Sequence, residues 1–252
     1  AVFVGVGKMK PKTIDVFDGL AAEQGYYHSK AFLLATSLAT KQGLAMAGIT
    51  TTTSTASHSP VIPSLEPPKL HGRVLVLGGG DVATDCARTA LRLGANRVTL
   101  CIRRNVSQFR ATDEEITMAF EEQVDVIPYA LPKHVVLDPA TGEIRSIELF
   151  KTEQDESGRY SIDEEQSFRV KCNFIISAFG SDVDDQICKA LEPVTLDKWN
   201  EIEVSDYGQT NDSRVFAGGD IAGSDTQVAA SNDGKSAAWG IHQLLNQLPA
   251  TT

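Results

Sequence analysis

The middle of the chain shows the clearest pattern of hydrophobic and polar positions. Arg73–Leu77 is a continuous apolar run typical of a buried strand, Asp81–Leu93 has the spacing of a helix, and Arg97–Ile102 is a second apolar run. A helix that joins two such strands within about 30 residues predicts a parallel strand, helix, strand unit, because parallel strands need a crossover connection. The sequence therefore predicts an α/β protein with a Rossmann-like domain.

The N-terminal part of the chain differs in character from that unit. Ala1–Gly7 predicts a buried strand that nothing before it pairs with or solubilises. We expect so apolar a strand to have neighbours on both sides, and we interpret the sequence as incomplete or as a processed piece of a larger protein. Ser29–Lys41 has its apolar residues on roughly one face and predicts a helix. The stretch Thr50–Pro68, rich in threonine, serine and proline, predicts a linker or disordered loop.

Elements of mixed polarity follow the central unit. Thr112 and Glu115 have the spacing of a capping box, which predicts a helix from there to about Gln123. Two alternating stretches around the polar turn Asp155–Gly158 predict an antiparallel β-hairpin arm within Glu143–Val170. The remaining predictions are strands at Val124–Tyr129, Phe174–Ser177 and Val215–Phe216 and a closing helix at Val228–Leu245.

Size and charge exclude several classes of protein. The chain has 252 residues, which is enough for one or two domains with a real core. Its net charge of -10 has the wrong sign for binding a phosphate backbone, so we do not expect nucleic acid as a partner. No apolar run approaches the roughly 20 residues of a membrane-spanning helix, and no leader precedes the first strand. These features predict a cytoplasmic protein with no membrane partner.

Side chains that carry chemistry on their own are sparse. The four cysteines form no C-x-x-C pair and have no histidine at metal spacing, so we predict buried, reduced thiols and no metal site. The five histidines are scattered over predicted loops and polar surfaces, where we expect them to be solvated. We predict no catalytic side chain. This suits a redox protein, in which cofactors carry the reaction and the protein orients them.

A glycine-rich motif lies between the first strand and the helix of the central unit. Gly78–Ala83 fits the pattern G-x-G-x-x-A, in which Gly78 permits a tight turn and Gly80 lets the backbone approach a pyrophosphate. Ala83 is small enough for the helix and strand to pack closely, and the helix N-terminus faces the phosphates. The motif predicts a dinucleotide site; the alternative is a tight turn alone.

Arginines stand where the second strand of such a unit ends. An NAD site carries an acid about 20 residues past the glycines for the ribose 2'-hydroxyl, whereas this chain has Arg103 and Arg104, with Arg110 a turn further on. A carboxylate would repel a 2'-phosphate, and guanidinium groups bind it bidentately. The cluster predicts NADPH rather than NADH; the alternative is a group of solvated surface arginines.

Two later strands also end in glycine-containing turns. Ala178–Gly180 ends one strand, and Gly218–Asp220 ends another. The second turn places the Asp220 carboxylate where it suits a ribose or ribityl hydroxyl, ahead of a helix N-terminus. Read in isolation, the turn is equally compatible with an ordinary helix cap.

Taken together, these motifs form a familiar series. It comprises Leu77–Asp81 with Asp85–Ala87, Arg103–Arg104, Phe109–Ala111, Lys151–Glu156, Ile176–Gly180, Phe216–Asp220 and Asn232–Lys235. The series resembles the dihydropyrimidine dehydrogenase family, specifically its NADPH-binding domain and the latter part of its FAD-binding domain. Glutamate synthase small subunits and related flavoprotein reductases share the glycine motif and the Gly-Gly-Asp turn and match the other segments less well.

The resemblance implies a module in which NADPH passes a hydride to FAD. Electrons would then travel through iron-sulfur clusters to an FMN site where uracil or thymine is reduced. Position by position, it implies that the NADPH pyrophosphate is held by Gly79, Gly80, Asp81 and Val82, between Gly78 and Ala83 of the same motif. It implies that the 2'-phosphate is held by Arg103, Arg104 and Arg110, and the nicotinamide half by Ala178, Phe179 and Gly180. It implies FAD contacts at Gly219, Asp220, Ile221, Ala222, Gly223 and Thr226, although Gly223–Val228 is slightly shorter than the family's pattern.

The resemblance also implies a domain layout. Residues 1–40 would be a strand and connection of the FAD domain, 41–70 a linker or insertion, 71–180 the NADPH-binding domain, and 181–252 the C-terminal part of the FAD domain. The first FAD fingerprint and the cluster cysteines are expected before Ala1 and the FMN barrel after Thr252, in an intact protein that is a homodimer. Two alternatives remain open: a reductase subunit of a glutamate-synthase-like complex, and a non-catalytic nucleotide-binding module.

Overall fold

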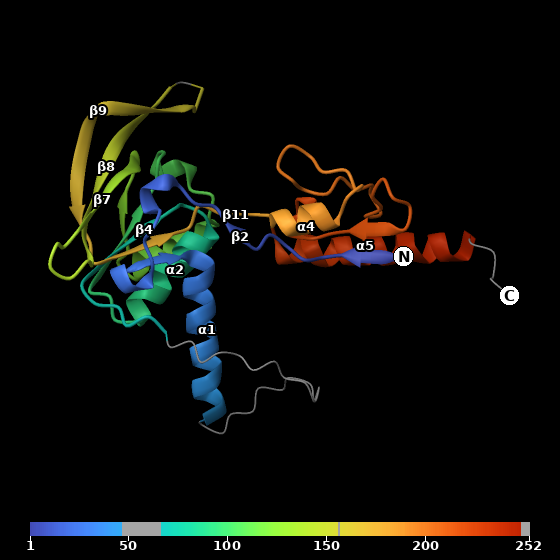
Figure 1. Cartoon of the computed structure of the whole chain (residues 1–252), viewed down its shortest axis with the longest axis horizontal. Helices are drawn as coiled ribbons and strands as arrows, with labels where there is room; N and C mark the ends of the chain where they lie inside the picture. The colour runs from blue at the N-terminus through green and yellow to red at the C-terminus, as the bar shows by residue number, and fades with distance from the viewer. Residues whose placement is uncertain (47–66, 156, 248–252) are drawn as a thin grey trace. The chain divides into compact units, whose positions relative to one another are not determined.

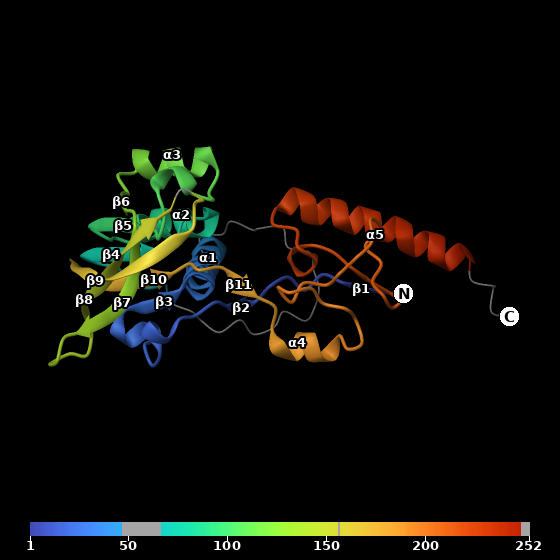
Figure 2. The same ribbon diagram turned by 90° about the horizontal axis from the view of Figure 1, so that it is seen from above.

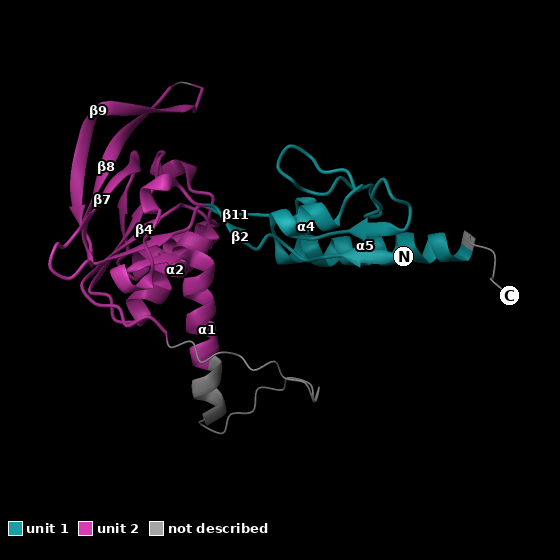
Figure 3. Cartoon of the chain, in the orientation of Figure 1, with its two compact units in different colours: residues 1–12, 180–252 teal, residues 13–179 magenta. Residues whose placement is uncertain are grey.

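The chain divides into two compact units. The computed structural model describes residues 1–46, 67–155 and 157–247. Residues 13–179 form the central unit, and residues 1–12 with 180–252 form the terminal unit (Figure 3). The predicted linker at Thr50–Pro68 lies almost entirely outside the described residues.

The central unit is built on a five-stranded parallel sheet of order β3-β10-β4-β5-β6. Leu75 and Val76 of the middle strand are both 1% exposed or less, so both faces of this sheet are covered. Burial on both faces is the reason why these strands appear as continuous apolar runs. The strands are β3 (Tyr26–His28), β4 (Arg73–Leu77), β5 (Arg97–Cys101), β6 (Asp125–Ile127) and β10 (Phe174–Ser177).

Helices cover one face of this sheet. Val74 and Val76 of β4 share a buried cluster with Phe32, Cys86 and Ala119, which lie on three different helices. The helices are α1 (Ser29–Met46), α2 (Asp81–Arg92) and α3 (Asp113–Glu121), and α2 and α3 lie side by side (Figure 2). The small side chains of α2 let this helix pack closely on the strands.

An antiparallel sheet covers the opposite face. Leu75 and Leu77 point to this side, where they share a cluster with Ile147 and Leu149. The sheet consists of β7 (Ala130–Leu137), β8 (Ile144–Gln154) and β9 (Tyr160–Lys171), and the long strands β8 and β9 extend past the parallel sheet as an arm (Figure 1). The predicted hairpin is confirmed, and β7 adds a third strand that the sequence analysis did not predict.

The terminal unit contains two small strand pairs. Strand β1 (Val2–Val4) pairs in parallel with β12 (Val215–Ala217), and β2 (Lys10–Pro11) pairs in antiparallel with β11 (Ser181–Asp182). Its buried cluster consists of Val183, Ile202, Ala217 and Ile221. Two helices, α4 (Asp185–Ala190) and α5 (Gln227–Gln247), and four short 3-10 helices at Asp15–Phe17, Ala22–Gln24, Val106–Gln108 and Asp220–Ala222 complete the described elements of the chain.

The expectation of a buried N-terminal strand with neighbours on both sides is wrong. The strand at Ala1–Gly7 is short and partly exposed, with Val2 at 59% and Phe3 at 45%, because β12 is its only partner strand among the described residues. Residues 1–40 are divided between the two units: residues from Thr13 onward belong to the central unit. The reason is long-range pairing, since β3 joins the parallel sheet beside β10 and Phe32 is fully buried in the helix-side core. No helix among the described residues is long and apolar enough to cross a membrane.

Candidate functional site

The strand order of the parallel sheet reverses beside β4. From β4 the chain continues through α2 to β5 and through α3 to β6, whereas β10 and β3 lie on the other side of β4. Ligands of open α/β sheets bind at such a reversal, outside the carboxyl ends of the strands. Leu77 of β4 is level with Ser177 of β10, so the glycine motif and the segment from Ala178 begin at the same edge. The candidate site is this edge.

The three glycines of the motif have different surroundings. Gly78 has a φ of +147°, and a Cβ there would lie 2.5 Å from the Ala178 carbonyl oxygen. A Cβ on Gly79 would lie 2.9 Å from Cγ2 of Ile102, whereas a Cβ on Gly80 would meet nothing within 4 Å. The first two glycines permit close packing, and the third leaves open space at the N-cap of α2. Open space before free helix N–H groups is what a pyrophosphate requires.

The first turn of α2 is anchored by a neighbouring loop. The Asp81 carboxylate accepts a hydrogen bond of 2.8 Å from the Thr112 backbone N–H. Thr112 Oγ1 in turn accepts a 3.4 Å bond from the backbone N–H of Glu115, as a helix cap does. The reciprocal half of the expected capping box is replaced, because the Glu115 carboxylate pairs with Arg88 at 3.1 Å. Val82 is 46% exposed on this turn.

Ala83, which follows that turn, is 1% exposed. It therefore packs inside the unit, in contact with the helix-side core rather than with solvent. Its small side chain contributes to helix packing and not to ligand contact.

The two arginines after β5 lie against a tyrosine of the arm. Arg103 donates a 3.2 Å hydrogen bond from Nη1 to the Tyr160 hydroxyl, and the centres of the two guanidinium groups lie 4.8 and 5.9 Å from the Tyr160 ring centroid. The Nε of Arg104 is the one buried side-chain polar atom without a hydrogen-bond partner among the described residues. An orphaned buried donor is costly unless a ligand satisfies it, and a phosphate oxygen is a suitable acceptor.

Arg110 reaches the site through the backbone. Its N–H donates a 2.7 Å bond to the Gly79 carbonyl, which also accepts a 3.2 Å bond from Ala111. Its side chain is exposed, with no partner among the described residues. The arginine loop is also attached to the arm, because Thr152 Oγ1 donates a 2.7 Å bond to the Arg103 carbonyl. All three arginines therefore start from backbone that is fixed to the glycine turn or to the arm.

A hydrogen-bonded cluster lies directly before the Ala178 segment. Ser177 Oγ lies 2.9 Å from the Tyr26 hydroxyl and 3.1 Å from Nδ1 of His28. Burial lowers the pKa of His28 and raises the pKa of Tyr26. His28 is thus part of a polar network, which corrects the expectation that it is solvated; β3 was not predicted, and without its pairing to β10 this contact is invisible. Phe179 lies against Phe17, with ring centroids 6.3 Å apart.

The Gly-Gly-Asp turn of the terminal unit is braced by an acid on α5. Gly219, at φ +77°, donates its N–H to Oδ2 of Asp233 at 2.9 Å, and Ser224 Oγ lies 2.5 Å from the same oxygen. The Asp220 carboxylate is exposed and has no side-chain partner among the described residues. Thr226 Oγ1 accepts a 3.1 Å bond from Ala229 and thereby caps α5. The turn therefore presents an acceptor beside a helix N-terminus.

Two residues expected in the flavin site point elsewhere. Ile221 is fully buried in the core of the terminal unit, and Ala222 packs against the same cluster. Their side chains stabilise the fold, and only their backbone atoms remain available to a ligand. Gly223, which follows, has a φ of +90° and is exposed.

Three contacts of the candidate site were not predicted from the sequence. Tyr160 and Ser177 lie 57 and 151 positions from Arg103 and Tyr26, whereas Asp233 lies only 14 positions from Gly219. Tyr160 carried one signal, since it is an aromatic residue at the start of a strand that is mostly polar up to Ser167. Asp233 lies in a segment of the motif series, but no pattern indicated its contact with Gly219.

Comparison with known proteins identifies relatives over most of the chain. The family model described as pyridine nucleotide-disulphide oxidoreductase matches residues 8–235. A putative oxidoreductase of Escherichia coli, AegA, is 33% identical over 257 aligned residues that cover 96% of this chain and 35% of its own length. The small chain of the NADPH glutamate synthase of Azospirillum brasilense is 35% identical over 174 residues, which cover 67% of this chain and 36% of its own length. The chain thus spans about a third of the length of these relatives.

Solved structures share the fold. Thioredoxin reductase of Lactococcus lactis superposes with a TM-score of 0.63 at 19% identity, over 98% of this chain and 66% of its own. FprA of Mycobacterium tuberculosis in complex with NADPH superposes with a TM-score of 0.65 at 14% identity, over 98% of this chain and 64% of its own. The α/β fold with Rossmann-like strands is therefore confirmed.

Proposed function

The chain belongs to the pyridine nucleotide-disulphide oxidoreductase family, and on that premise we propose that it is the part of a larger flavoprotein where electrons enter from NADPH. Membership makes it a module of an NADPH-dependent flavoprotein oxidoreductase with NADPH and FAD as cofactors. The observation that carries the proposed site is the Arg104 Nε, a buried donor with no partner within residues 1–46, 67–155 and 157–247. It lies next to a tyrosine that contacts both arginines.

In this proposal a different segment of the central unit binds each part of NADPH. The open N-terminus of α2, from Gly80 through Val82, donates backbone N–H groups to the pyrophosphate. Arg103 and Arg104 bind the 2'-phosphate with guanidinium groups that Tyr160 already orients, and Arg110 adds charge. The Ala178–Gly180 segment lies at the strand reversal and receives the nicotinamide half.

The terminal unit would hold the flavin. The Asp220 carboxylate accepts a hydrogen bond from a flavin hydroxyl, and the N-terminus of α5 faces its anionic part. Asp233 keeps this turn in place by its two hydrogen bonds and does not itself touch the ligand. The flavin held here would supply the two-electron chemistry, taking a hydride from NADPH and passing electrons on, while these residues bind and orient it.

Nucleotide preference tests the proposed site. We expect the chain to bind NADPH more tightly than NADH in calorimetric titrations. In Arg103→Ala/Arg104→Ala the two affinities should become similar, since each lost charge-assisted bond costs about 1.5–3 kcal/mol. Arg159→Ala, which removes an exposed arginine at the tip of the arm, is the control and should keep the preference. Equal affinities in the unmutated chain would overturn the assignment.

The finer proposal is that the larger protein is a dihydropyrimidine dehydrogenase. The motif series supports it, including Lys151–Glu156, in which Thr152 and Gln154 attach the arm to the arginine loop. The chain would then deliver electrons to the rest of the enzyme, a homodimer when intact, for reduction of uracil or thymine at a distant FMN. The test is NADPH oxidation by the full-length protein: dependence on uracil supports this proposal.

A glutamate-synthase-like reductase is the second candidate, favoured by the 35% identity with the A. brasilense small chain. In the same assay this candidate requires NADPH oxidation that is independent of uracil and coupled to glutamate formation. A non-catalytic nucleotide-binding module is the third alternative. It would be supported if NADPH raised the melting temperature while no flavin bound and no NADPH was oxidised.

A further inference from the structure

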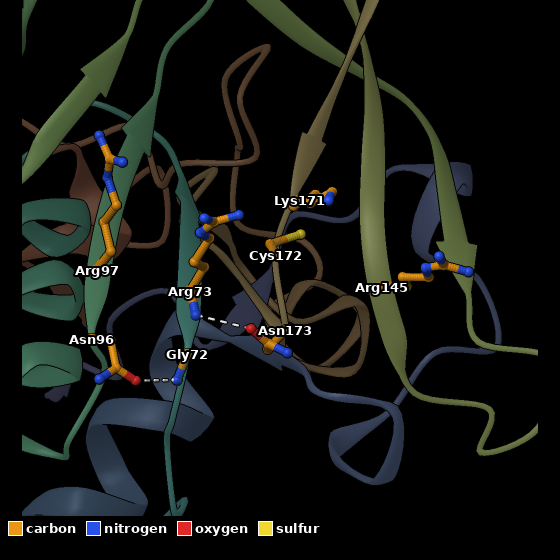
Figure 4. A pocket seen from close by; sticks show the side chains of 8 residues that line it. All are labelled: Gly72, Arg73, Asn96, Arg97, Arg145, Lys171, Cys172 and Asn173. Atoms are coloured by element: carbon orange, nitrogen blue, oxygen red, sulfur yellow. Dashed lines mark hydrogen bonds between the residues drawn. The ribbon is translucent and has the colours of Figure 1, made fainter.

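A pocket lined by basic residues lies at the opposite edge of the parallel sheet. It has a volume of about 470 Å³ and is lined by strand ends and the loops before them (Figure 4). Four of its lining residues are basic, and none is acidic. The lining consists of Gly72, Arg73, Asn96, Arg97, Arg145, Lys171, Cys172 and Asn173.

The fold brings these four basic residues together from four strands. Arg73 and Arg97 are the first residues of β4 and β5 and stand side by side in parallel register. Arg73 is two residues before Leu75 and therefore points to the face that the antiparallel sheet covers. Arg145 and Lys171 lie at the near ends of β8 and β9. The pocket therefore lies where the parallel sheet and the antiparallel sheet of the central unit meet, and we call its four basic residues the basic rim.

The positive charge of this rim is largely uncompensated. Arg97 forms an ion pair with Asp125 at 2.5 Å, whereas the other three basic side chains have no ion pair or hydrogen bond among the described residues. Like charges directly opposite each other on a sheet are destabilising. In a chain with a net charge of -10, four exposed cations that line one pocket make this part of the surface locally positive.

Neutral donors complete the lining. Oδ1 of Asn173 accepts a 2.9 Å bond from the Arg73 N–H, and Oδ1 of Asn96 accepts a 2.7 Å bond from Gly72, as the dashed lines in Figure 4 show. Each amide is thereby oriented with its NH2 group unpaired among the described residues. Cys172 is 3% exposed, and burial raises its pKa to about 12, so no thiolate competes with an anion.

We propose that this pocket binds a small anion of the phosphate class that carries at least two negative charges. The guanidinium groups and the two amides supply donors, and no lining carboxylate repels the ligand. The site is separate from the nucleotide site, because Arg73 and Gly78 lie at opposite ends of β4, roughly 17 Å apart along a strand of this length. The ligand is either free phosphate or the phosphate group of a small ester.

Titration in the presence of saturating NADPH tests the proposal, because the nucleotide site is then blocked. Inorganic phosphate and glycerol phosphate are the two probes, added to the full chain at low ionic strength and followed by calorimetry. We expect saturable binding of at least one probe, and the tighter probe identifies the source of the phosphate. Absence of binding at millimolar concentrations, or competition with NADPH, would overturn the proposal.

Two matched variants assign the site. Arg145→Gln/Lys171→Gln removes two exposed charges from the pocket and should weaken phosphate binding by roughly tenfold or more. Arg159→Gln/Lys198→Gln removes the same charge outside both proposed sites and should leave phosphate binding unchanged. Equal weakening by the two double variants would show that net charge is the cause and would contradict the proposal. Retained NADPH binding shows that the pocket variant is folded. As an independent measurement, the side-chain amide resonances of Asn96 and Asn173 should shift when phosphate is added.

Discussion

The two units of this chain have unequal cores. In the central unit both faces of a five-stranded sheet are covered, and residues such as Leu75 and Ile176 are 1% exposed or less. The terminal unit has two-stranded pairs, and large apolar side chains such as Trp199 at 60% and Val228 at 80% lie exposed on it. Apolar side chains alone therefore do not form a core. A core forms where layers of secondary structure pack against each other, because a side chain is buried only when another layer covers it.

We expect this difference to appear as two thermal transitions, with the central unit the more stable. Differential scanning calorimetry with NADPH resolves them, since a ligand raises the stability of the unit that binds it by mass action. A single transition that NADPH moves as a whole would contradict the comparison. The variants below act on one unit at a time, from the largest effect to the smallest.

Gly78→Ala should produce the largest effect. A methyl group there would lie 2.5 Å from a backbone oxygen at a φ of +147°, and neither strand end moves easily. We expect the central unit to lose about 2–4 kcal/mol of stability while the terminal transition stays in place. Gly80→Ala is the matched control, because its methyl group would meet nothing within 4 Å. Gly80→Ala should cost about 1 kcal/mol or less and act mainly on NADPH affinity.

Asp233→Ala should act on the terminal unit alone. The substitution removes the acceptor for Gly219 N–H and Ser224 Oγ, and we expect a loss of about 1–3 kcal/mol with weaker flavin binding. Asp233→Asn keeps an acceptor oxygen and should therefore lose less stability and less flavin affinity than Asp233→Ala. Calorimetry and flavin fluorescence measure the two effects. A change in NADPH affinity would show that the two units are not separable in this way.

Variants of Tyr160 test the proposed nucleotide site of the central unit. Tyr160→Ala removes the ring that orients both arginines and should weaken NADPH binding roughly three- to tenfold, with NADH unaffected. Tyr160→Phe keeps the ring and loses only the 3.2 Å hydroxyl contact, so it should have a smaller effect. Equal losses for NADPH and NADH would place the role of Tyr160 in general stability instead.

The reactivity of the cysteine thiols compares burial in the two units without changing their stability. Burial raises the pKa values of Cys86, Cys101 and Cys172 in the central unit to about 12, so at pH 8 these thiols are almost entirely protonated. Cys188 of the terminal unit is half-buried. We expect a disulfide reagent to modify Cys188 first in the native protein and the other three only after unfolding. Mass spectrometry of the modified peptides identifies the order, and early labelling of Cys101 would contradict it.

Local pattern was sufficient for the best-predicted parts of the fold. Arg73–Leu77 and Phe174–Ser177 were predicted with the bounds that the structure has, because the interior of a strand buried on both faces is continuously apolar. The helix beginning at Asp81 follows from the glycine turn before it. Strand β3, by contrast, has no pattern of its own and exists through its pairing with β10. Because β3 was not predicted, no local pattern indicated that residues from Thr13 onward pack with the central unit.

The sequence by itself therefore determined the strand, helix, strand unit, the glycine turn and the arginines that follow it. Each depends on residues within one or two elements, where periodicity and turn chemistry act directly. Only the tertiary structure decided that Tyr160 holds Arg103 across 57 positions and that Tyr26 meets Ser177 across 151. The same holds for the basic rim around Arg73, which four separate strands build. Register between distant strands sets these contacts, and no local pattern encodes it.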